Sequence, residues 1–397
     1  MGYRRAMQER LSARIRSVTP SATMAMTQAA REMRAAGRDV IGLSAGEPDF
    51  ATPAHVKAAT ERALADGHTG YTAVDGIPEL KRAVCAKFAR DNAIDVNPSQ
   101  VNVSPGGKAV IWNALAVTCG PGDEVIVPTP CWVSYPDMVR LTGATAVMLA
   151  GGGDFKITPE ALAGAITPAT RWLMLNSPSN PTGAVYSHAE LERLAEVLRA
   201  HPHVMVLSDD IYEALVYGEA RFATLASVAP DLAARCLTMN GVSKAYAMTG
   251  FRIGYAAGPE WLIAAMRKFM GQTTSNPTSI AQWAAVAALE GPQDFLDAWR
   301  ATYRARGAAM VDALNRAGLR CALPDGAFYV FADCRTVMAE RGHATDADLA
   351  MALLEEAGVA TVPGSAFHAP GHLRLSYAAS LEAIEAACAR IAEFTGH

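Results

Sequence analysis

The sequence lacks several features that would point to particular classes of function. Its 397 residues carry a net charge of only −4 at pH 7, which gives no long-range attraction toward nucleic acid or an anionic membrane. No apolar run approaches the ~18 residues of a membrane span. Neither a GxxxxGK[ST] nor a GxGxxG pattern is present, so a dinucleotide site would rest on fold type alone. We therefore expect neither nucleic acid nor a membrane as a partner.

Cysteine is sparse and shows no pattern that would organise a metal or a disulfide framework. The seven cysteines are odd in number and lie in apolar surroundings, at Cys85, Cys119, Cys131, Cys236, Cys321, Cys334 and Cys388. We expect free thiols in a reducing compartment, which favours a cytoplasmic protein. His201 and His203 could suggest a metal pair, but no third ligand is near and a surface turn is the better interpretation. No metal site is predicted.

The N-terminus is basic and has no apolar core of a secretion signal. Its arginines are Arg4, Arg5, Arg10, Arg14 and Arg16, and they could belong to a transit peptide. We prefer an amphipathic helix, because Leu11 and Ile15 lie four residues apart.

Composition and periodicity indicate a soluble protein with a large α/β part. Hydrophobic residues make up 51% of the chain and charged residues 19%, and the length allows two domains. From about residue 78 onward, helices alternate with short apolar strands, expected at 101–103, 124–128, 171–175, 204–207 and 236–239. This alternation is typical of a mostly parallel sheet covered by helices on both faces.

The pattern changes after about residue 290. The expected elements are a long helix over 294–317, a hairpin of 319–323 and 327–332, short strands at 359–362 and 373–376, and a last helix over 380–395. This is an α+β module, and the residues before the large sheet are expected to pack with it. We therefore expect a large domain at 50–290 and a small domain formed by 1–49 and 291–397.

Polar or aromatic residues follow the ends of five predicted strands. They are Gly106-Gly107-Lys108, Trp132, Asn176 with Asn180, Asp209 with Tyr212, and Lys244. Each alone has an ordinary explanation, such as a helix cap for Asp209 or a turn for Asn180. Ligands of open parallel sheets bind at the carboxyl ends of strands, so five such ends together indicate a site. Lys244 could form an imine with an aldehyde cofactor, and Arg252 could hold that cofactor's phosphate.

Eight stretches follow one another along nearly the whole chain in the order found in one family. They are Ser44–Phe50, Gly70–Leu80, Pro121–Val125, Asn176–Gly183, Asp209–Tyr212, Ser243-Lys244, Gly250–Arg252 and Arg374–Tyr377. Together they resemble the fold-type I pyridoxal-phosphate aminotransferases, and more narrowly the bacterial aspartate aminotransferases that include prephenate-acting members. The resemblance implies a large domain with a mostly parallel seven-stranded sheet between helices, a smaller α+β domain, pyridoxal 5'-phosphate as cofactor, and a homodimer with shared active sites.

The resemblance also implies the roles of the residues around the cofactor ring. Lys244 is expected to bond to the cofactor's aldehyde and then to move the proton at the substrate α-carbon. Asp209 is expected to pair with the protonated ring nitrogen. Tyr212 and Asn180 would hydrogen-bond the 3-oxygen of the ring, and Trp132 would stack on its face.

Further roles concern the phosphate and the substrate. The phosphate is expected to be held by Arg252 and by backbone N–H groups of Gly106, Gly107 and Lys108 at a helix start. Ser243 is also expected to bind the cofactor. Tyr71 is expected to reach the phosphate in the neighbouring subunit. Arg374 would bind the substrate α-carboxylate, and Gly46 would line the substrate pocket with Trp132 and Asn180.

Two positions and one stretch depart from what the family suggests. Gly241 stands where many relatives carry a phosphate-binding hydroxyl, and Asp210 stands where glutamate is commoner. We attach no role to Asp210. Residues 113–116 include no lysine, although some aspartate-acting relatives use one on this helix to bind the side-chain carboxylate. Lys108 or an N-terminal arginine could substitute.

The expected reaction is ping-pong transfer of the amino group of L-aspartate to 2-oxoglutarate, giving oxaloacetate and L-glutamate. One alternative is an aminotransferase for aromatic amino acids, prephenate or another amino acid, and another is a different pyridoxal-phosphate reaction on an amino acid. A remote alternative is a ligand-sensing regulator. Fewer than fifty residues precede Gly46, and the net charge is slightly negative, which speaks against a DNA-binding module ahead of the fold.

Overall fold

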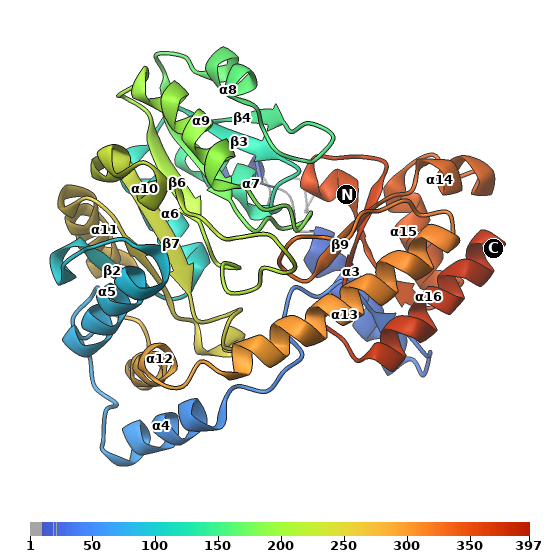
Figure 1. The fold of residues 1–397 in the computed structure, drawn as a ribbon, viewed down its shortest axis with the longest axis horizontal. Helices are drawn as coiled ribbons and strands as arrows, with labels where there is room; N and C mark the ends of the chain where they lie inside the picture. The colour runs from blue at the N-terminus through green and yellow to red at the C-terminus, as the bar shows by residue number, and fades with distance from the viewer. Residues whose placement is uncertain (1–9, 19, 21) are drawn as a thin grey trace.

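A seven-stranded sheet lies at the centre of the larger part of the molecule, as a computed structural model of residues 10–18, 20 and 22–397 shows (Figure 1). In order across the sheet, the strands are β2 (Val101–Ser104), β8 (Gly254–Ala257), β7 (Cys236–Gly241), β6 (Met205–Asp209), β5 (Thr170–Asn176), β3 (Glu124–Thr129) and β4 (Thr145–Ala150). β8 runs antiparallel to both of its neighbours, and the other neighbouring pairs are parallel. The expected mostly parallel sheet of seven strands is confirmed.

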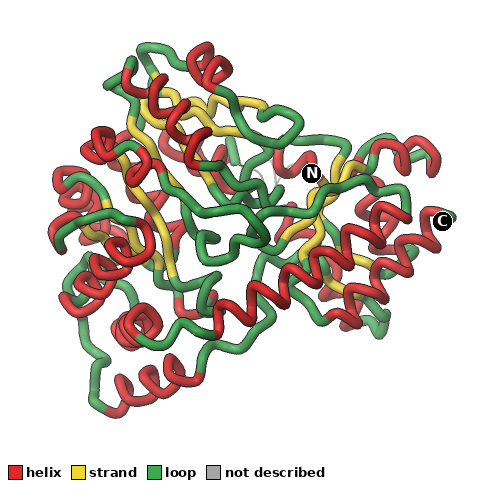
Figure 2. Tube along the Cα trace, viewed as in Figure 1, coloured by secondary structure: helices red, strands yellow, loops and turns green. Residues whose placement is uncertain are grey.

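Helices cover both faces of this sheet (Figure 2). Successive side chains of each strand point to opposite sides, so apolar residues on both faces need a cover. Val125 and Val127 of β3 pack toward α6 (Gly107–Thr118), α7 (Ser134–Thr142) and α11 (Glu260–Thr273). Ile126, between them, packs on the other face, which is covered by α8 (Pro159–Ala165), α9 (His188–Arg199) and α10 (Leu225–Val228). Near β2 and β8 the cover consists of α4 (Ala54–Ala65), α5 (Pro78–Asn92) and α12 (Ser279–Glu290).

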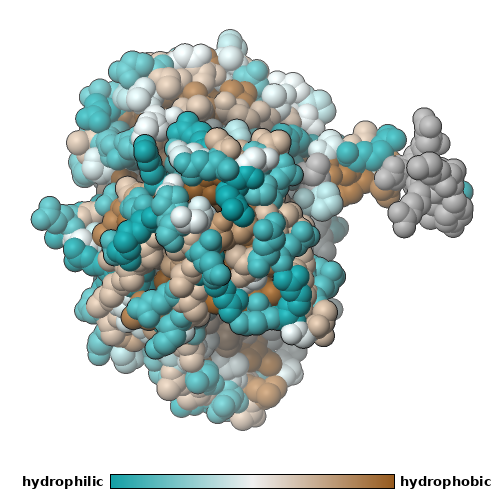
Figure 3. All heavy atoms as spheres, turned by 90° about the vertical axis from the view of Figure 1, so that its right-hand side faces the viewer, coloured by the Kyte–Doolittle hydropathy of each residue, from teal (hydrophilic) through white to brown (hydrophobic). Residues whose placement is uncertain are grey.

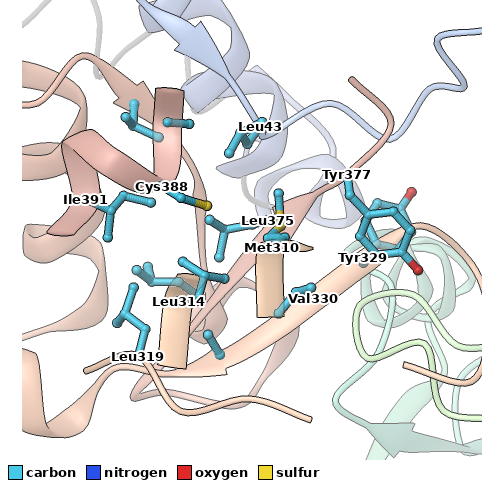
Figure 4. Close-up of a cluster of buried hydrophobic side chains, with 14 of the residues drawn as sticks. Leu43, Met310, Leu314, Leu319, Tyr329, Val330, Leu375, Tyr377, Cys388 and Ile391 are labelled. Atoms are coloured by element: carbon cyan, nitrogen blue, oxygen red, sulfur yellow. The ribbon is translucent and has the colours of Figure 1, made fainter. Parts of the chain in front are cut away.

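A second core is formed by the C-terminal residues together with the segment that precedes the large sheet. Its strands are β1 (Ile41–Gly42), β9 (Tyr329–Asp333), β10 (Val359–Ala360), β11 (Val362–Pro363) and β12 (His372–Ser376), and its helices are α3 (Ala22–Ala35), α13 (Phe295–Arg316), α14 (Arg335–Arg341), α15 (Asp346–Glu355) and α16 (Leu381–Thr395). Figure 4 shows Leu43 in one cluster with Met310 of α13 and Ile391 of α16. This packing supports the division at residues 50 and 290, which stays a proposal.

The predicted hairpin around residue 325 was wrong. Residues 319–323 form no strand, and only Arg320 makes an isolated bridge, to Asp333. β9 pairs with β12 instead. The turn bonds to the loop after β6, where the N–H of Tyr217 donates to the carbonyl of Asp325 and the N–H of Ala327 donates to the carbonyl of Leu215. The predicted strand 359–362 is likewise divided between β10 and β11, which belong to different sheets.

The predicted N-terminal amphipathic helix is reduced to one turn, α2 (Ala13–Arg16), with Ser12 as its cap. None of its residues is buried, and Leu11 and Ile15 are 48% and 47% exposed, so the expected buried face is absent from this turn. Figure 3 shows this segment projecting from the body of the molecule. Arg4 and Arg5 lie outside the described residues.

The other predicted elements are present within a few residues of their expected ends. All seven cysteines are free. In the described part of the chain, no helix is both long and apolar enough to cross a membrane.

Candidate active site

Three predicted residues meet at one edge of the large sheet. Asn176 ends β5, Asp209 ends β6, and Lys244 follows the end of β7 by three residues. These strands are parallel neighbours, so their carboxyl ends lie together. The side-chain amide of Asn176 donates to the main-chain carbonyl of Asp209 at 2.9 Å, which ties the first two strand ends to each other.

Asp209 is a buried carboxylate with hydrogen-bond donors on both oxygens. Tyr135 of α7 donates its hydroxyl to Oδ2 at 2.5 Å, and the N–H of Ile211 donates to Oδ1 at 3.2 Å. Burial raises the pKa of Asp209 to about 6, although Tyr135, the Ile211 N–H and Lys244 all favour its ionised form. Asp209 is therefore poised to stay charged once a cation is placed beside it.

Lys244 carries an amine that is unusually easy to deprotonate. Its Nζ donates to the carbonyl of Gly46 and lies 5.8 Å from the ring centre of Tyr212. Burial, Arg374 and Arg252 lower its pKa to about 8, and Glu47 and Asp209 only partly oppose this. A pKa of about 8 leaves roughly a tenth of the amine neutral at pH 7, so Lys244 can act as a nucleophile or a base.

A cationic corner forms where α6 begins. Gly106 has a φ of 92°, and a Cβ at this position would overlap the guanidinium of Arg252, which therefore lies directly over the loop. The N–H groups of Gly107 and Lys108 are the first of α6, where helix N–H groups lack partners within the helix. This corner thus joins a fixed charge to free backbone donors, the combination that binds phosphate groups.

The same corner leaves no space for a side chain at residue 241. Gly241 lies opposite Gly254 in the pairing of β7 with β8. A Cβ at Gly241 would lie 2.9 Å from the carbonyl oxygen of Ile253, and a Cβ at Gly254 would overlap the main chain of Gly106 and Gly107. The loop before α6 and the two strands approach so closely that a side chain at residue 241 has no space.

Lys108 adds a second cation to this corner. Its Nζ lies 4.8 Å from the ring centre of Trp132, and the surrounding protein and Arg252 lower its pKa. Within the described ranges, the salt bridges of the chain include neither Lys108 nor Arg252, and Arg252 donates only to the carbonyl of Thr249, at 2.9 Å. Two cations without an acidic partner favour a multiply charged anion as the ligand.

Arg374 is a buried guanidinium that has only neutral partners. Its Nη1 donates to the side-chain oxygen of Asn180 at 2.9 Å, and its Nη2 donates to the carbonyl of Ser44 at 2.6 Å. Its Nε is buried and has no hydrogen-bond partner in the described structure, and burial lowers the pKa of Arg374. A buried cation with an unused donor is costly, so this position is prepared for a carboxylate ligand.

Two aromatic rings enclose that guanidinium. The ring centres of Tyr329 and Phe367 lie 4.4 and 4.9 Å from Cζ of Arg374. Tyr329 also contacts Tyr212, with 2.8 Å between the two hydroxyl oxygens. Tyr135 and Tyr329 were missed in the sequence, because each contacts a site residue that lies far away along the chain. Phe367 lies only a few residues before Arg374 and was also missed, because no motif marks it.

Tyr71 differs from the buried members of the predicted site in its exposure. It is 94% exposed. Ser243, next to Lys244, is buried, and its carbonyl accepts the N–H of Met248 at 3.2 Å.

Asp210 is buried next to Asp209, and its Oδ1 accepts a hydrogen bond from the hydroxyl of Ser208 at 2.7 Å. Among the described residues, no group of histidine, cysteine and acidic side chains could hold a metal ion.

Comparison with known proteins places this geometry in context. Residues 38–391 match the profile of the family described as aminotransferase class I and II. The chain is 55% identical to the aspartate/prephenate aminotransferase of Cereibacter sphaeroides, over 97% of this chain and 98% of that protein. It is 49% identical to the aspartate aminotransferase of Geobacillus stearothermophilus, over 97% and 98%. The crystal structure of the aspartate aminotransferase from Rhizobium meliloti aligns with a TM-score of 0.94 at 47% identity, covering 98% of this chain and 99% of that one.

Proposed function

The chain belongs to the class I and II aminotransferase family, and on that premise we propose that it transfers the amino group of L-aspartate to 2-oxoglutarate with pyridoxal 5'-phosphate as cofactor. Relatives named aspartate aminotransferase share 49% and 48% of its residues over nearly its full length. The observation that carries the proposal is a match of charges. The cationic corner suits the phosphate, Asp209 suits the ring nitrogen, and Arg374 suits the α-carboxylate.

The residues present fit this cofactor. Those proposed to hold the phosphate are Arg252, Ser243 and the backbone N–H groups of Gly107 and Lys108. The N–H of Gly106, which was also predicted to hold the phosphate, donates instead to the carbonyl of Ser104 at 2.6 Å. Those proposed to hold the ring are Asp209, Tyr212, Asn180 and Trp132. Lys244 is proposed to bond to the aldehyde. When bound, the cofactor withdraws electrons from the substrate α-carbon and stores the amino group between the two half-reactions.

The chain's own residues then orient the substrate and move its proton. Arg374, fixed between two rings and two acceptors, binds the α-carboxylate and so sets the direction of the Cα–H bond. Once the substrate amine has displaced it from the aldehyde, Nζ of Lys244, with a pKa of about 8, would take the proton from Cα and give it to the former aldehyde carbon. Asp209 stays ionised beside the ring nitrogen because Tyr135 and the Ile211 N–H stabilise its charge.

We propose that Lys108 binds the side-chain carboxylate of aspartate. Its ammonium lies over Trp132, which lines the substrate pocket in the proposal, and it has no acidic partner in the described structure. An N-terminal arginine remains the alternative. Arg14 and Arg16 are exposed on α2.

Prephenate is a second candidate substrate, because relatives at 55% and 51% identity are named aspartate/prephenate and probable aspartate/prephenate aminotransferases. A panel of amino donors and oxo-acid acceptors tests both candidates. The readout is the absorbance change of the bound cofactor from its aldehyde to its amine form, followed by product analysis. We expect aspartate to produce the amine form and 2-oxoglutarate to reverse it. If aspartate leaves the spectrum unchanged, the proposed function is wrong.

A homodimer is part of the proposal. Tyr71 at 94% exposure and Leu64 at 58% are large side chains that the single chain leaves uncovered, which agrees with a Tyr71 that reaches the phosphate in a second subunit. The proposed location is the cytoplasm, which the free cysteines support.

A further inference from the structure

We propose that Tyr329 is a positioning residue that links the carboxylate-binding arginine to the tyrosine beside the cofactor ring, an inference that rests on the proposed function. The ring of Tyr329 supports Arg374, and its hydroxyl holds Tyr212. Neither contact follows from the eight stretches that carry the family resemblance, because Tyr329 lies outside all of them.

Strand pairing places Tyr329 beside Arg374. Arg374 of β12 lies opposite Phe331 of β9, and Ser376 lies opposite Tyr329. Residues two apart on a strand share a face, so Tyr329 is a diagonal neighbour of Arg374 on that face. Figure 4 shows Tyr329 at the edge of the buried cluster, with its hydroxyl pointing away from Met310 and Leu314.

The ring of Tyr329 restrains the guanidinium from one side. It lies 4.4 Å from Cζ of Arg374, and Phe367 lies on the same group at 4.9 Å. Tyr329 is fully buried, and a cation over a ring is held more strongly where water is absent. The ring therefore keeps Arg374 in place before a carboxylate arrives.

The hydroxyl of Tyr329 sets the direction in which Tyr212 can donate. A tyrosine hydroxyl has one proton to donate, and the two hydroxyl oxygens are 2.8 Å apart. If Tyr212 donates a hydrogen bond to the 3-oxygen of the cofactor, its hydroxyl hydrogen is no longer available to Tyr329. Tyr329 must then be the donor in the hydrogen bond between the two hydroxyls. A donor that itself accepts a hydrogen bond donates more strongly, so Tyr329 strengthens the bond from Tyr212 to the cofactor oxygen.

Gly46 completes this arrangement on the side of Lys244. A Cβ on Gly46 would lie 2.7 Å from the hydroxyl oxygen of Tyr329, while the carbonyl of Gly46 accepts from Nζ of Lys244. The absence of a side chain at residue 46 therefore allows Tyr329 to reach Tyr212. Tyr329 thus lies beside three groups of the site: Arg374, Tyr212, and Gly46, whose carbonyl accepts from Lys244.

Two substitutions separate the two halves of the proposal. The probe is maleate, a dicarboxylate that has no amino group to transfer. In Tyr329→Leu the ring is lost, and we expect the affinity of the cofactor-loaded protein for maleate, measured by calorimetry, to fall roughly tenfold or more. In Tyr329→Phe the ring remains, and maleate affinity should stay within about twofold of the wild type. The absorbance transition of the bound cofactor should move to higher pH in Tyr329→Phe, because the ionised 3-oxygen is stabilised less.

Matched controls come from the same buried cluster. Tyr303→Leu removes an equally buried ring that does not contact Arg374, and Tyr377→Phe removes a hydroxyl that donates to the carbonyl of Ala327 at 3.2 Å. We expect both to lower the melting temperature without changing maleate affinity or the absorbance transition. If Tyr329→Leu binds maleate as the wild type does, or if Tyr303→Leu loses as much affinity, the positioning role is wrong. A wild type that takes up no cofactor would instead overturn the proposed function.

A second experiment needs no cofactor or ligand. Gly46→Ala should lower the stability of the cofactor-free protein, because the new methyl group meets the hydroxyl of Tyr329. In a Tyr329→Phe background that oxygen is gone and the next atom, Cζ, is 3.8 Å away, so most of the loss should disappear. Strictly additive losses in melting temperature would show that Tyr329 does not occupy the space beside Gly46.

Discussion

Arg252 and Arg374 are both arginines without an acidic partner in the described structure, yet their surroundings differ in almost every respect. Arg252 is exposed, lies in a left-handed conformation with φ 54°, and faces a loop whose shape comes from glycine. Arg374 is 2% exposed, lies between two aromatic rings and donates to two neutral oxygens. In the proposal, the first corner fixes a ligand through backbone shape. The second holds a charge out of water before its ligand arrives.

Because of this difference, the loss of the arginine should have a different effect in each corner. A corner made of backbone N–H groups and an exposed guanidinium retains most of its donors when the arginine is removed. A buried guanidinium has no substitute, because the neighbouring oxygens and rings cannot bind a carboxylate. Loss of Arg252 should therefore weaken the cofactor, whereas loss of Arg374 should abolish productive binding of the substrate.

The largest effect is expected for Arg374→Leu. We expect kcat/KM for aspartate to fall by roughly 10²–10³-fold or more, since a buried, hydrogen-bonded charge pair with the α-carboxylate is lost. Cofactor affinity should stay within about threefold. The melting temperature should change little, because the desolvation cost of the buried charge is removed while the hydrogen bonds to Asn180 and Ser44 are lost. Steady-state kinetics, a cofactor titration and thermal unfolding check these points. Equal losses of substrate and cofactor binding would break the distinction between the corners.

Arg252→Leu is the matched change in the exposed corner. We expect cofactor affinity to fall roughly 10- to 100-fold, the range for loss of a hydrogen bond to a charged group. At saturating cofactor, KM for aspartate should change little. An absorbance titration of the cofactor-free protein measures the first quantity, and a kinetic assay with excess cofactor measures the second. A variant that binds the cofactor normally would remove Arg252 from the proposed phosphate site.

Lys108→Met sharpens the comparison, because Lys108 lies in the exposed corner but is proposed to serve the substrate. We expect kcat/KM for aspartate to fall roughly tenfold through loss of a charge-assisted contact. For alanine, which has no side-chain carboxylate, kcat/KM should stay close to the wild-type value. Parallel losses for aspartate and alanine would assign Lys108 to the cofactor instead.

The smallest effects concern pH, through the two titrating groups between the corners. Lys244, with a pKa of about 8, must lose its proton to attack the aldehyde, and Asp209, with a pKa of about 6, must be ionised to pair with the ring nitrogen. Uptake of the cofactor by the cofactor-free protein should therefore be slow below pH 6, rise through the interval between the two values and level off above pH 8. In Asp209→Asn the rise near pH 6 should vanish while the rise near pH 8 remains. Stopped-flow absorbance across this range measures the rates, and a rate that does not change with pH would contradict both assignments.

Local patterns were sufficient to predict the parts of the structure that depend on neighbours in sequence. Apolar strands between helices predicted the large sheet, and polar residues at strand ends predicted Asn180, Asp209 and Lys244 in the site. β4 was missed although residues 146–150 are all apolar, and as an edge strand it has no buried residue. The hairpin was wrong because the turn at Asp325 bonds to residue 217, a pairing that no local pattern encodes.

The supporting residues of the site show the same limit. Tyr135 reaches Asp209 across 74 positions, and Tyr329 reaches Tyr212 across 117. In the sequence both read as ordinary aromatic residues of a core. Only the fold shows that their hydroxyls end at the two residues proposed to hold the cofactor ring.

The central claim is that one amine, Nζ of Lys244, bonds to the aldehyde of the cofactor. Protein loaded with pyridoxal phosphate can be treated with borohydride, which makes such a bond permanent, and then digested and analysed by mass spectrometry. The account predicts the added mass on the peptide that contains Lys244, and its loss together with the yellow colour in Lys244→Ala. An adduct on Lys108 or on another lysine, or no adduct at all, would contradict it.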